Sequence, residues 1–441
     1  MGELLFLQFN DLKRNWKMLT LKFIQQNPDF VIERLKVKHF DATDIIRQVN
    51  ELNVQRRTTQ TKVDALKSEM NNLSKEIGLL YKDQKIAEAN AAKERTAELK
   101  DEIKNLDQSF AEIDEKLNNL VVLLPNIPNE LVPEGRTAED NLEIRRGGVI
   151  PSLPEDKLPH WELIKKYDII DFDLGIKLTG AGFPVYKGKG AKIQRALINF
   201  FLNEGENAGF REIQPPIMVN EDSGFGTGQL PDKEGQMYHA TADNLYMIPT
   251  AEVPVTNIYR DVILDESELP IKNMAYTPCF RREAGSWGAH VRGLNRLHQF
   301  DKVEIVEIAH PDHSYQILDE MVAHVESLVN KLGLPYRIIR LCGGDMSFTS
   351  AMTYDFEVFS AAQERWLEVS SVSNFETFQA NRLKCRFKGK DSKKTELVHT
   401  LNGSALALPR ILAAILENYQ TPDGIKVPEV LVPFCGFDMI R

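Results

Sequence analysis

The chain has few cysteines and no long apolar run. Only Cys279, Cys342, Cys385 and Cys435 occur among 441 residues, and no two of them have CxxC spacing. Such scattered cysteines argue against a disulfide framework and a zinc site, and they are typical of a reducing compartment. No apolar stretch approaches the roughly 20 residues that a membrane helix needs, and the first residues lack the cleavage site of a secretory signal. We therefore expect a cytoplasmic protein without a membrane segment.

The sequence also lacks a P-loop and an excess of basic residues. Without a GxxxxGK[ST] motif, any bound ATP must be held in another way. The net charge of −10 leaves a nucleic-acid partner open, because binding depends on where basic residues cluster rather than on their total. The glycine- and lysine-rich segment 187–192 is better interpreted as an exposed turn leading into a helix than as a phosphate cradle.

Proline is absent between Pro28 and Pro125, and Gly78 is the only glycine in that interval. Beyond it, glycine and proline recur throughout the chain. This change in composition predicts a long helical region followed by a mixed globular one. We expect three parts: an N-terminal extension of residues 1–17, a helical domain of residues 18–130 and a globular domain of residues 131–441.

The helical region contains two heptad series separated by a polar stretch around Tyr81–Lys85. Their steps of four and three keep one apolar seam facing a partner helix. The seams are Ile45, Val49, Leu52, Arg56, Thr59, Val63, Leu66, Met70, Leu73, Ile77 and Leu80, and Ala89, Ala92, Thr96, Leu99, Ile103, Leu106, Phe110, Ile113, Leu117, Leu120 and Leu124. This predicts an antiparallel hairpin roughly 55–60 Å long. Its periodicity is compatible with dimerisation as well as with nucleic-acid binding.

The globular region alternates β-rich and helical runs. The β-rich runs include residues 274–280, 302–308, 336–341 and 354–359. Their spacing and polar connections predict an antiparallel sheet with flanking helices, an α+β fold. Pro278 suits a sheet edge or a bulge.

Arginines lie at both ends of a glycine-containing loop between two predicted strands. The loop opens with Arg281, Arg282 and Glu283 and returns past Arg296 to Phe300. Arginine forks bind phosphate or carboxylate in a bidentate manner, and the Phe300 ring offers a flat surface for a base. Taken singly, these residues could equally form surface ion pairs or belong to the core.

The combination resembles motif 2 of class II aminoacyl-tRNA synthetases, in the form that seryl-tRNA synthetases of bacterial type carry. Further resemblances follow in the family's order and cover nearly all of residues 18–441: motif 1 at 209–216, the serine-binding TAE loop at 249–257, the ATP- and metal-contacting segment at 368–375, and motif 3 at 399–404 with Arg410.

The resemblance implies a role for each matching residue. The serine site would comprise Thr250, Ala251, Glu252, Glu304 and Ser404. The ATP site would comprise Arg281, Arg282, Glu283, Arg296, Phe300, Glu368, Val369, Ser370, Ser371 and Arg410. Among these, Arg281, Glu283 and Arg410 would be catalytic, Phe300 and Arg410 would sandwich the adenine ring, and Glu368 and Ser371 would hold Mg²⁺.

The implied function is activation of L-serine by ATP, followed by transfer of the seryl group to the 3′ end of serine tRNA. The implied partners are L-serine, serine tRNA and a second copy of the chain, with charging of selenocysteine tRNA left open. The hairpin would bind the tRNA. Two other hypotheses remain: a relative that activates another small amino acid or charges a carrier protein, and an inactive paralogue.

The chain departs from the family pattern in two places. Ala405 and Pro409 stand where many bacterial relatives have glycine, and Pro409 would fit best in the first turn of the following helix. The segment starting at Met18 resembles the family's N-terminus, so Met18 is the expected initiator unless residues 1–17 form a disordered extension.

Overall fold

The computed structural model describes residues 20–232, 235–282 and 292–441. The expectations for Met18, for residues 1–17 and for Glu283 lie outside these described residues. The chain forms two compact units, Met1–Ile127 and Pro128–Arg441. Among the described residues, no helix combines the length and apolar character needed to cross a membrane.

The first unit consists of two short helices and two long ones: α1 (Leu21–Gln26), α2 (Pro28–Lys36), α3 (Thr43–Lys82) and α4 (Ile86–Val121). The Thr20 hydroxyl accepts a hydrogen bond from the Phe23 amide at 3.2 Å and thus caps α1. Pro28 lies in the first turn of α2, where its missing N–H costs nothing. Both short helices pack against α3.

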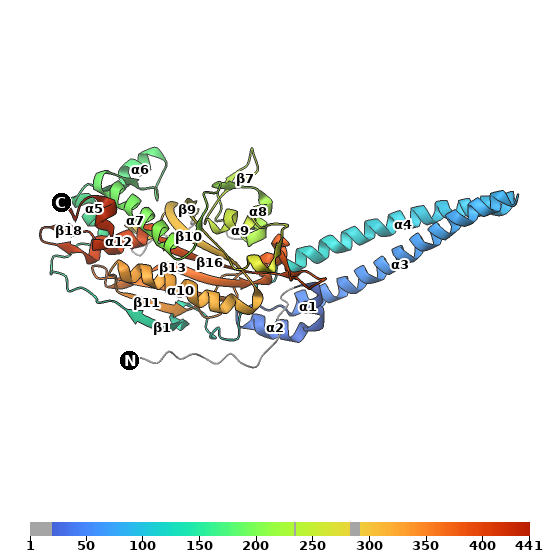
Figure 1. Ribbon diagram of the computed structural model, residues 1–441, viewed down its shortest axis with the longest axis horizontal. Helices are drawn as coiled ribbons and strands as arrows, with labels where there is room; N and C mark the ends of the chain where they lie inside the picture. The colour runs from blue at the N-terminus through green and yellow to red at the C-terminus, as the bar shows by residue number, and fades with distance from the viewer. Residues whose placement is uncertain (1–19, 233–234, 283–291) are drawn as a thin grey trace. The chain divides into compact units, whose positions relative to one another are not determined.

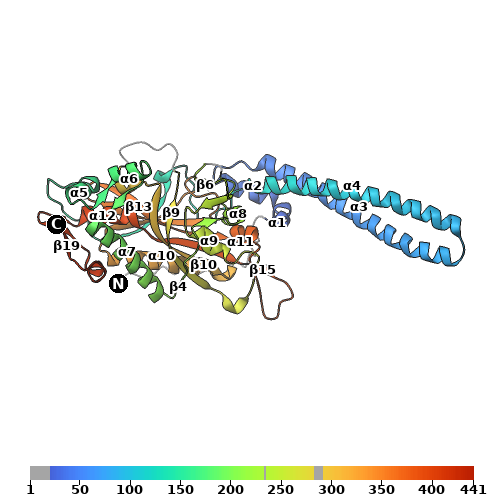
Figure 2. The same cartoon turned by 90° about the horizontal axis from the view of Figure 1, so that it is seen from above.

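The predicted hairpin is confirmed, because α3 and α4 lie side by side along their length in both views (Figures 1 and 2). Every predicted seam position is buried or half-buried, and the fully buried seam leucines are Leu99, Leu117 and Leu124. The helices contain 40 and 36 residues, which corresponds to about 54–60 Å. They are joined at the predicted tip, where Gln84 adopts a left-handed backbone with φ of 56°.

The polar residue Arg56 lies within the apolar seam and is paired across it. Its guanidinium lies 3.2 Å from the Asp114 carboxylate and 5.9 Å from the centroid of the Phe110 ring. Because these partners come from the opposite helix, they favour one alignment of the two helices over a shifted one.

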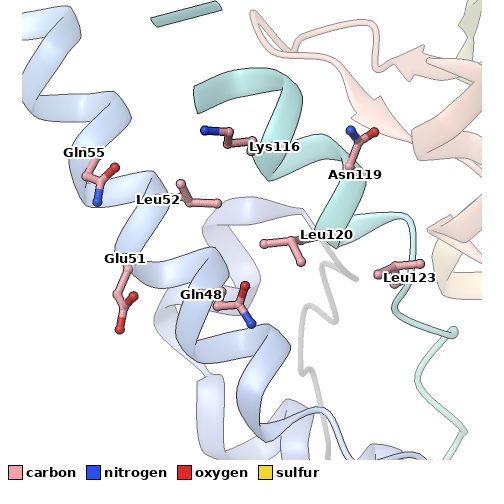
Figure 3. A pocket seen from close by; sticks show the side chains of 8 residues that line it. All are labelled: Gln48, Glu51, Leu52, Gln55, Lys116, Asn119, Leu120 and Leu123. Atoms are coloured by element: carbon pink, nitrogen blue, oxygen red, sulfur yellow. The ribbon is translucent and has the colours of Figure 1, made fainter. Parts of the chain in front are cut away.

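A cavity of about 440 Å³ lies at the end of the hairpin away from its tip (Figure 3). Leu52 of α3 and Leu120 of α4 point toward one another there. Its remaining lining side chains are mostly polar: Gln48, Glu51, Gln55, Lys116, Asn119 and Leu123. None of the residues assigned to the serine or ATP site lines this cavity.

The second unit contains helices and strands in mixed order. Its helices are α5 (His160–Lys166), α6 (Phe172–Leu178), α7 (Gly188–Asn207), α8 (Glu221–Thr227), α9 (Glu252–Asn257), α10 (Ser314–Lys331), α11 (Thr377–Leu383), α12 (Leu408–Asn418) and α13 (Val432–Cys435). Its main strands are β1 (Leu142–Gly147), β4 (Arg211–Glu212), β9 (Ile271–Phe280), β10 (Gln299–Ala309), β11 (Tyr336–Arg340), β12 (Met352–Ser360), β13 (Arg365–Glu376) and β16 (His399–Ala407).

Shorter strands form small sheets around the main one: β2 (Ile170–Asp171), β3 (Val185–Tyr186), β5 (Met218–Val219), β6 (His239–Ala240), β7 (Leu245–Met247), β8 (Ile263–Asp265), β14 (Arg386–Lys388), β15 (Glu396–Leu397), β17 (Gln420–Thr421), β18 (Gly424–Lys426) and β19 (Met439–Ile440).

The described residues form a sheet with the strand order β1-β11-β12-β13-β16-β10-β9-β4. All neighbours are antiparallel except β4, which runs parallel to β9. Helices α10 and α12 pack on this sheet, and α10 buries apolar side chains such as Leu318 and Val325. The α+β prediction is confirmed. Three of the four predicted β-rich runs fall within β9, β10 and β12, and the run 336–341 extends one residue beyond β11.

One local expectation is confirmed and another needs correction. Pro278 lies on β9 beyond the two residues, Asn273 and Met274, that pair with the edge strand β4. The segment 187–192 is not the expected exposed turn, because α7 already starts at Gly188 and residues 188–192 belong to it; Lys187 precedes the helix, and its ammonium lies 3.1 Å from the Asp171 carboxylate.

We predict that Leu99→Ala loosens the hairpin. Removing a fully buried leucine side chain leaves a cavity and costs roughly 2–5 kcal/mol. Amide hydrogen exchange and limited proteolysis within residues 43–121 should both accelerate. Leu79→Ala is the matched control, since that leucine is 62% exposed on the same hairpin. Equal effects of the two substitutions would contradict the assigned seam.

Candidate active site

The centre of the sheet carries a buried group of polar side chains on one face. Alternation along β10 places Phe300, Lys302 and Glu304 on the same face, and Glu304 lies opposite Ser404 of β16. The Glu304 carboxylate is 1% exposed. It accepts hydrogen bonds from the Asn402 amide at 3.1 Å and the Ser404 hydroxyl at 3.4 Å, and the Lys302 ammonium lies 2.6 Å away.

A second buried carboxylate, that of Glu252, belongs to the same neighbourhood. Glu252 begins α9, and its amide donates to the Thr250 hydroxyl at 3.2 Å. The Gln379 amide of α11 donates to the Glu252 carboxylate at 2.6 Å. Gln379 in turn accepts a hydrogen bond from the Thr400 hydroxyl at 2.7 Å. This chain of bonds fixes the Glu252 side chain against β16.

The charges around Glu252 oppose one another. The pKa of Glu252 is raised to about 7 overall. Burial is the largest cause and the negative charge of Glu304 adds to it, while the Gln379 hydrogen bond, Lys302 and Arg281 act in the opposite direction. Two buried carboxyl groups thus lie in one neighbourhood, where the Lys302 ammonium is closely paired with Glu304. A cationic ligand group placed between them would relieve their repulsion.

Arg281 directly follows β9 and lies over Phe300. The centre of its guanidinium is 5.3 Å from the centroid of the Phe300 ring. Its amide donates to the His298 carbonyl at 2.9 Å, so the two ends of the loop meet there. Arg282 is fixed through its amide, which donates to the Gln236 carbonyl at 2.8 Å. Arg296 lies exposed shortly before β10.

Arg410 lies in the first turn of α12, and Pro409 occupies that turn as predicted. The Arg410 guanidinium donates to the backbone carbonyl of Glu368 at 2.7 Å and to that of Asn295 at 3.0 Å. It also lies 3.6 Å from the Glu368 carboxylate. Arg410 therefore connects β13 with the end of the loop that contains Arg296.

A β-bulge explains how Glu368 and Ser371 can act together. Residues three apart on a regular strand face opposite sides. In β13 the register shifts, because Asp355 pairs with Ser371 whereas Glu357 pairs with Glu368. The extra residue brings Glu368 and Ser371 to the same face. Val369 and Ser370 lie within this bulged stretch, where the Ser370 hydroxyl donates to the Ser404 carbonyl at 2.5 Å.

Asp355 adds a buried carboxyl group beside this pair. Burial raises the pKa of Asp355 well above its usual range, the charge of Glu368 raises it further, and a hydrogen bond with Ser371 lowers it. Within the ranges that the structure describes, no group of three or more His, Cys, Asp and Glu side chains is arranged to hold a metal ion by itself.

Sequence reasoning missed four side chains of this site: Lys302, Asp355, Gln379 and Asn402. Two of them had a usable signal. Lys302 precedes Glu304 by two residues on a predicted strand and therefore shares its face. Asn402 likewise precedes Ser404 by two residues. Gln379 and Asp355 reach the site only through tertiary packing.

Comparison with known proteins gives a consistent result for both units. Residues 18–128 match the profile of the seryl-tRNA synthetase N-terminal domain, and residues 237–419 match that of the tRNA synthetase class II core domain (G, H, P, S and T). The chain is 49% identical over 424 residues to the serine–tRNA ligase of Salinibacter ruber, which covers 96% of this chain and 99% of that protein.

Two solved structures are similar over the same extent. The seryl-tRNA synthetase of Pyrococcus horikoshii complexed with ATP has a TM-score of 0.86 at 31% identity, covering 96% of this chain and 99% of that one. The cytoplasmic serine–tRNA ligase of Naegleria fowleri in complex with AMP has a TM-score of 0.85 at 26% identity, with coverage of 96% and 99%.

We predict that Glu252→Gln stabilises the ligand-free protein at high pH. Burial is the main reason that the pKa of Glu252 is raised to about 7. The protonated Glu252 side chain therefore contributes stability that is fully present below the usual carboxyl pKa and is lost as the pH rises through about 7. Above that pH the wild type carries a buried ionised carboxylate that the variant lacks.

The free energy of unfolding of Glu252→Gln relative to wild type should therefore rise between about pH 5 and pH 9, by up to roughly 3 kcal/mol. Denaturant titrations across this range measure the difference. Glu206→Gln, at an exposed position of α7, controls for the loss of a surface carboxylate. A pH-independent difference for Glu252→Gln would contradict the assignment of a buried titrating group.

Proposed function

The chain belongs to the seryl-tRNA synthetase family, and from this premise we propose which of its residues bind serine, which bind ATP and Mg²⁺, and which bind the tRNA. It activates L-serine with ATP to seryl-adenylate and transfers the seryl group to the 3′ end of serine tRNA. The observation that best supports this assignment of residues is the buried polar group around Glu304, with Glu252 and Lys302 beside it.

We assign the serine site to this group. The ammonium of serine would lie near Glu252, whose carboxylate shares its dry surroundings with Glu304 and gains a partner when the substrate binds. Glu304 and Ser404 would contact the small polar side chain, with Thr250 and Ala251 completing the pocket. Alanine would leave these buried polar groups without a partner, which disfavours its binding.

The ATP site is assigned to the neighbouring loop and strands. Arg281 would contact the α-phosphate and the serine carboxylate, and Phe300 and Arg410 would enclose the adenine ring. Arg282 and Arg296, from opposite ends of the loop, would add positive charge for the phosphates. Glu283, which lies outside the described residues, would face the adenine edge. Val369 and Ser370 contribute the bulged backbone beside them.

Glu368 and Ser371 would hold Mg²⁺ against the phosphates. A pair of protein oxygens on one face suits this ion, which keeps waters and substrate oxygens in its remaining positions. When bound, the ion would neutralise phosphate charge during nucleotidyl transfer. Asp355 lies opposite Ser371 on the neighbouring strand β12 and would orient its hydroxyl through their hydrogen bond.

Positioning and charge neutralisation account for the chemistry without a protein nucleophile. An oxygen of the serine carboxylate attacks the α-phosphorus, the bond to the β-phosphate oxygen breaks, and pyrophosphate leaves. A terminal ribose hydroxyl of the tRNA then attacks the acyl carbon of the adenylate, and AMP leaves. Arg281 serves the first step best, because its cation faces the charge that develops on the α-phosphate.

The hairpin is proposed as the tRNA-binding element, and serine tRNA as its ligand. Exposed basic side chains of α3 would contact the phosphates: Arg57, Lys62, Lys75 and Lys67, the last of which lies 3.4 Å from the Asp107 carboxylate of α4. We further propose a homodimer formed through the motif 1 segment 209–216, where the short edge strand β4 lies. A cytoplasmic location agrees with four buried free thiols.

The proposed sites are tested by ATP–pyrophosphate exchange with Mg²⁺ and a panel of amino acids, without tRNA. Exchange should be driven by serine well above alanine, threonine and glycine. Arg281→Ala should reduce serine-dependent exchange by roughly 1,000-fold or more, whereas Arg195→Ala, at an exposed position of α7, should retain it.

The outcomes separate the alternatives. Exchange driven by another amino acid would move the substrate assignment and leave the reaction class intact. No exchange with any amino acid would favour an inactive paralogue. Normal exchange by Arg281→Ala would remove the role assigned to that residue.

Replacing residues 50–115 with a short turn should separate the two steps. Adenylation should persist, because every residue assigned to the serine and ATP sites belongs to the second unit. Charging of serine tRNA should fall by roughly 100-fold or more, since the phosphate contacts would be lost. Selenocysteine tRNA is tested in the same assay. Charging at the wild-type rate would contradict a role of the hairpin in tRNA binding.

A further inference from the structure

The end of the loop that contains Arg296 rests on a buried histidine of α5. His160 is fully buried. Its Nε2 accepts a hydrogen bond from the Leu294 amide at 2.9 Å, and its Nδ1 lies 2.6 Å from the Glu417 carboxylate. Because an amide can only donate, Nε2 carries no proton, so Nδ1 carries the proton that is shared with Glu417. The ring therefore joins α12 to the loop backbone.

The fit between His160 and the loop is close. A Cβ atom added to Gly293 would lie 2.3 Å from Nε2 of His160, and Gly293 has a φ of +69°. Both the contact and the left-handed backbone require glycine at this position. The two residues after His160 hold the preceding part of the loop: Arg292 lies 5.1 Å from the Trp161 ring centroid and 3.2 Å from the Glu162 carboxylate.

A second path connects Glu417 to Arg410. The Gln363 amide donates to the Glu417 carboxylate at 2.9 Å, and the Asn295 amide donates to the Gln363 carbonyl oxygen at 3.2 Å. The Asn295 backbone carbonyl then accepts the hydrogen bond from Arg410. Arg410 and Glu417 are two turns apart on α12, so both face the same loop segment.

We propose that His160 is a positioning residue for ATP binding: it fixes the backbone at residues 293–295, and thereby the carbonyl that orients Arg410. The proposal rests on the role given to Arg410 above. His160 itself touches neither substrate. Its hydrogen bonds to Leu294 and Glu417 set the place of the loop end relative to α12, and Gln363 reinforces that placement.

Two conservative substitutions test the two hydrogen bonds of His160 separately, because each can preserve one bond and not the other. In His160→Gln the amide oxygen can reach the place of Nε2 and accept from Leu294. In His160→Asn the amide nitrogen can reach the place of Nδ1 and donate to Glu417, but the Leu294 amide stays buried and unpaired. The proposal depends on the hydrogen bond to Leu294, so the two variants should differ in their KM for ATP.

The test is ATP–pyrophosphate exchange by the full chain, with the KM for ATP and the KM for serine measured separately. His160→Asn and His160→Ala should raise the KM for ATP by roughly tenfold, the effect of one unpaired buried donor, with the KM for serine within about twofold of wild type. His160→Gln should restore the KM for ATP to within about threefold of wild type.

Two further variants keep the result interpretable. Gln363→Leu breaks the second path and keeps the His160 side chain itself, whose Nδ1 lies 3.5 Å from the Gln363 amide nitrogen. It should also raise the KM for ATP selectively, so it replaces His160→Ala if that variant does not fold. His324→Ala removes a half-buried imidazole that packs on Phe210 of the same unit, and should leave the KM for ATP unchanged.

The proposal is overturned if His160→Asn and Gln363→Leu leave the KM for ATP unchanged. It is also overturned if the variants raise the KM values for ATP and serine together, or lower kcat alone, since these patterns indicate general destabilisation. The absence of serine-dependent exchange in the wild type would instead contradict the function proposed above. A failure of that function can thus be distinguished from a failure of the proposal for His160.

Discussion

The candidate site depends on the burial of the Glu304 carboxyl group inside a sheet. Removing a polar or charged group from water is costly unless close partners replace the solvent. Here Lys302 on the same strand and Ser404 on the adjacent one supply those partners. All of them come from β10 and β16, whose antiparallel register holds them opposite one another. The centre of the sheet thus fixes the buried polar group, while the loop between β9 and β10 and the start of α12 supply the arginines at its border.

The features that could be predicted from the sequence were those in which apolar residues recur at a regular helical or strand spacing. The hairpin follows from the heptad spacing and from the absence of proline and glycine, which is why both its seam and its tip were found. Strands β9 to β12 follow from β-rich runs. On β10, the alternation that places Glu304 also places Lys302, yet a lysine on a strand is usually a surface residue, and periodicity alone gives no reason to bury it.

The remaining features arise from breaks in the period and from contacts between distant segments. Regular alternation would separate Glu368 from Ser371, and only the register shift in β13 unites them. A bulge has no residue signature at this position, so the pair was found through resemblance. The bonds that join His160 to Glu417, 257 residues apart in the chain, are equally invisible to local patterns. The parts of this site that depend on a bulge or on contacts between distant segments are thus the parts that a regular residue spacing cannot predict.

The departure at Pro409 shows how a local rule can preserve a distant contact. Proline in the first turn of a helix loses no hydrogen bond, and its fixed φ favours the helical start. Helix α12 can therefore begin directly after β16. Arg410 then lies in the first turn, within reach of the carbonyls of Glu368 and Asn295. A proline one turn later would remove a helical hydrogen bond and clash with the preceding turn. The substitution is compatible with the site because it falls where the helix has no N–H to lose.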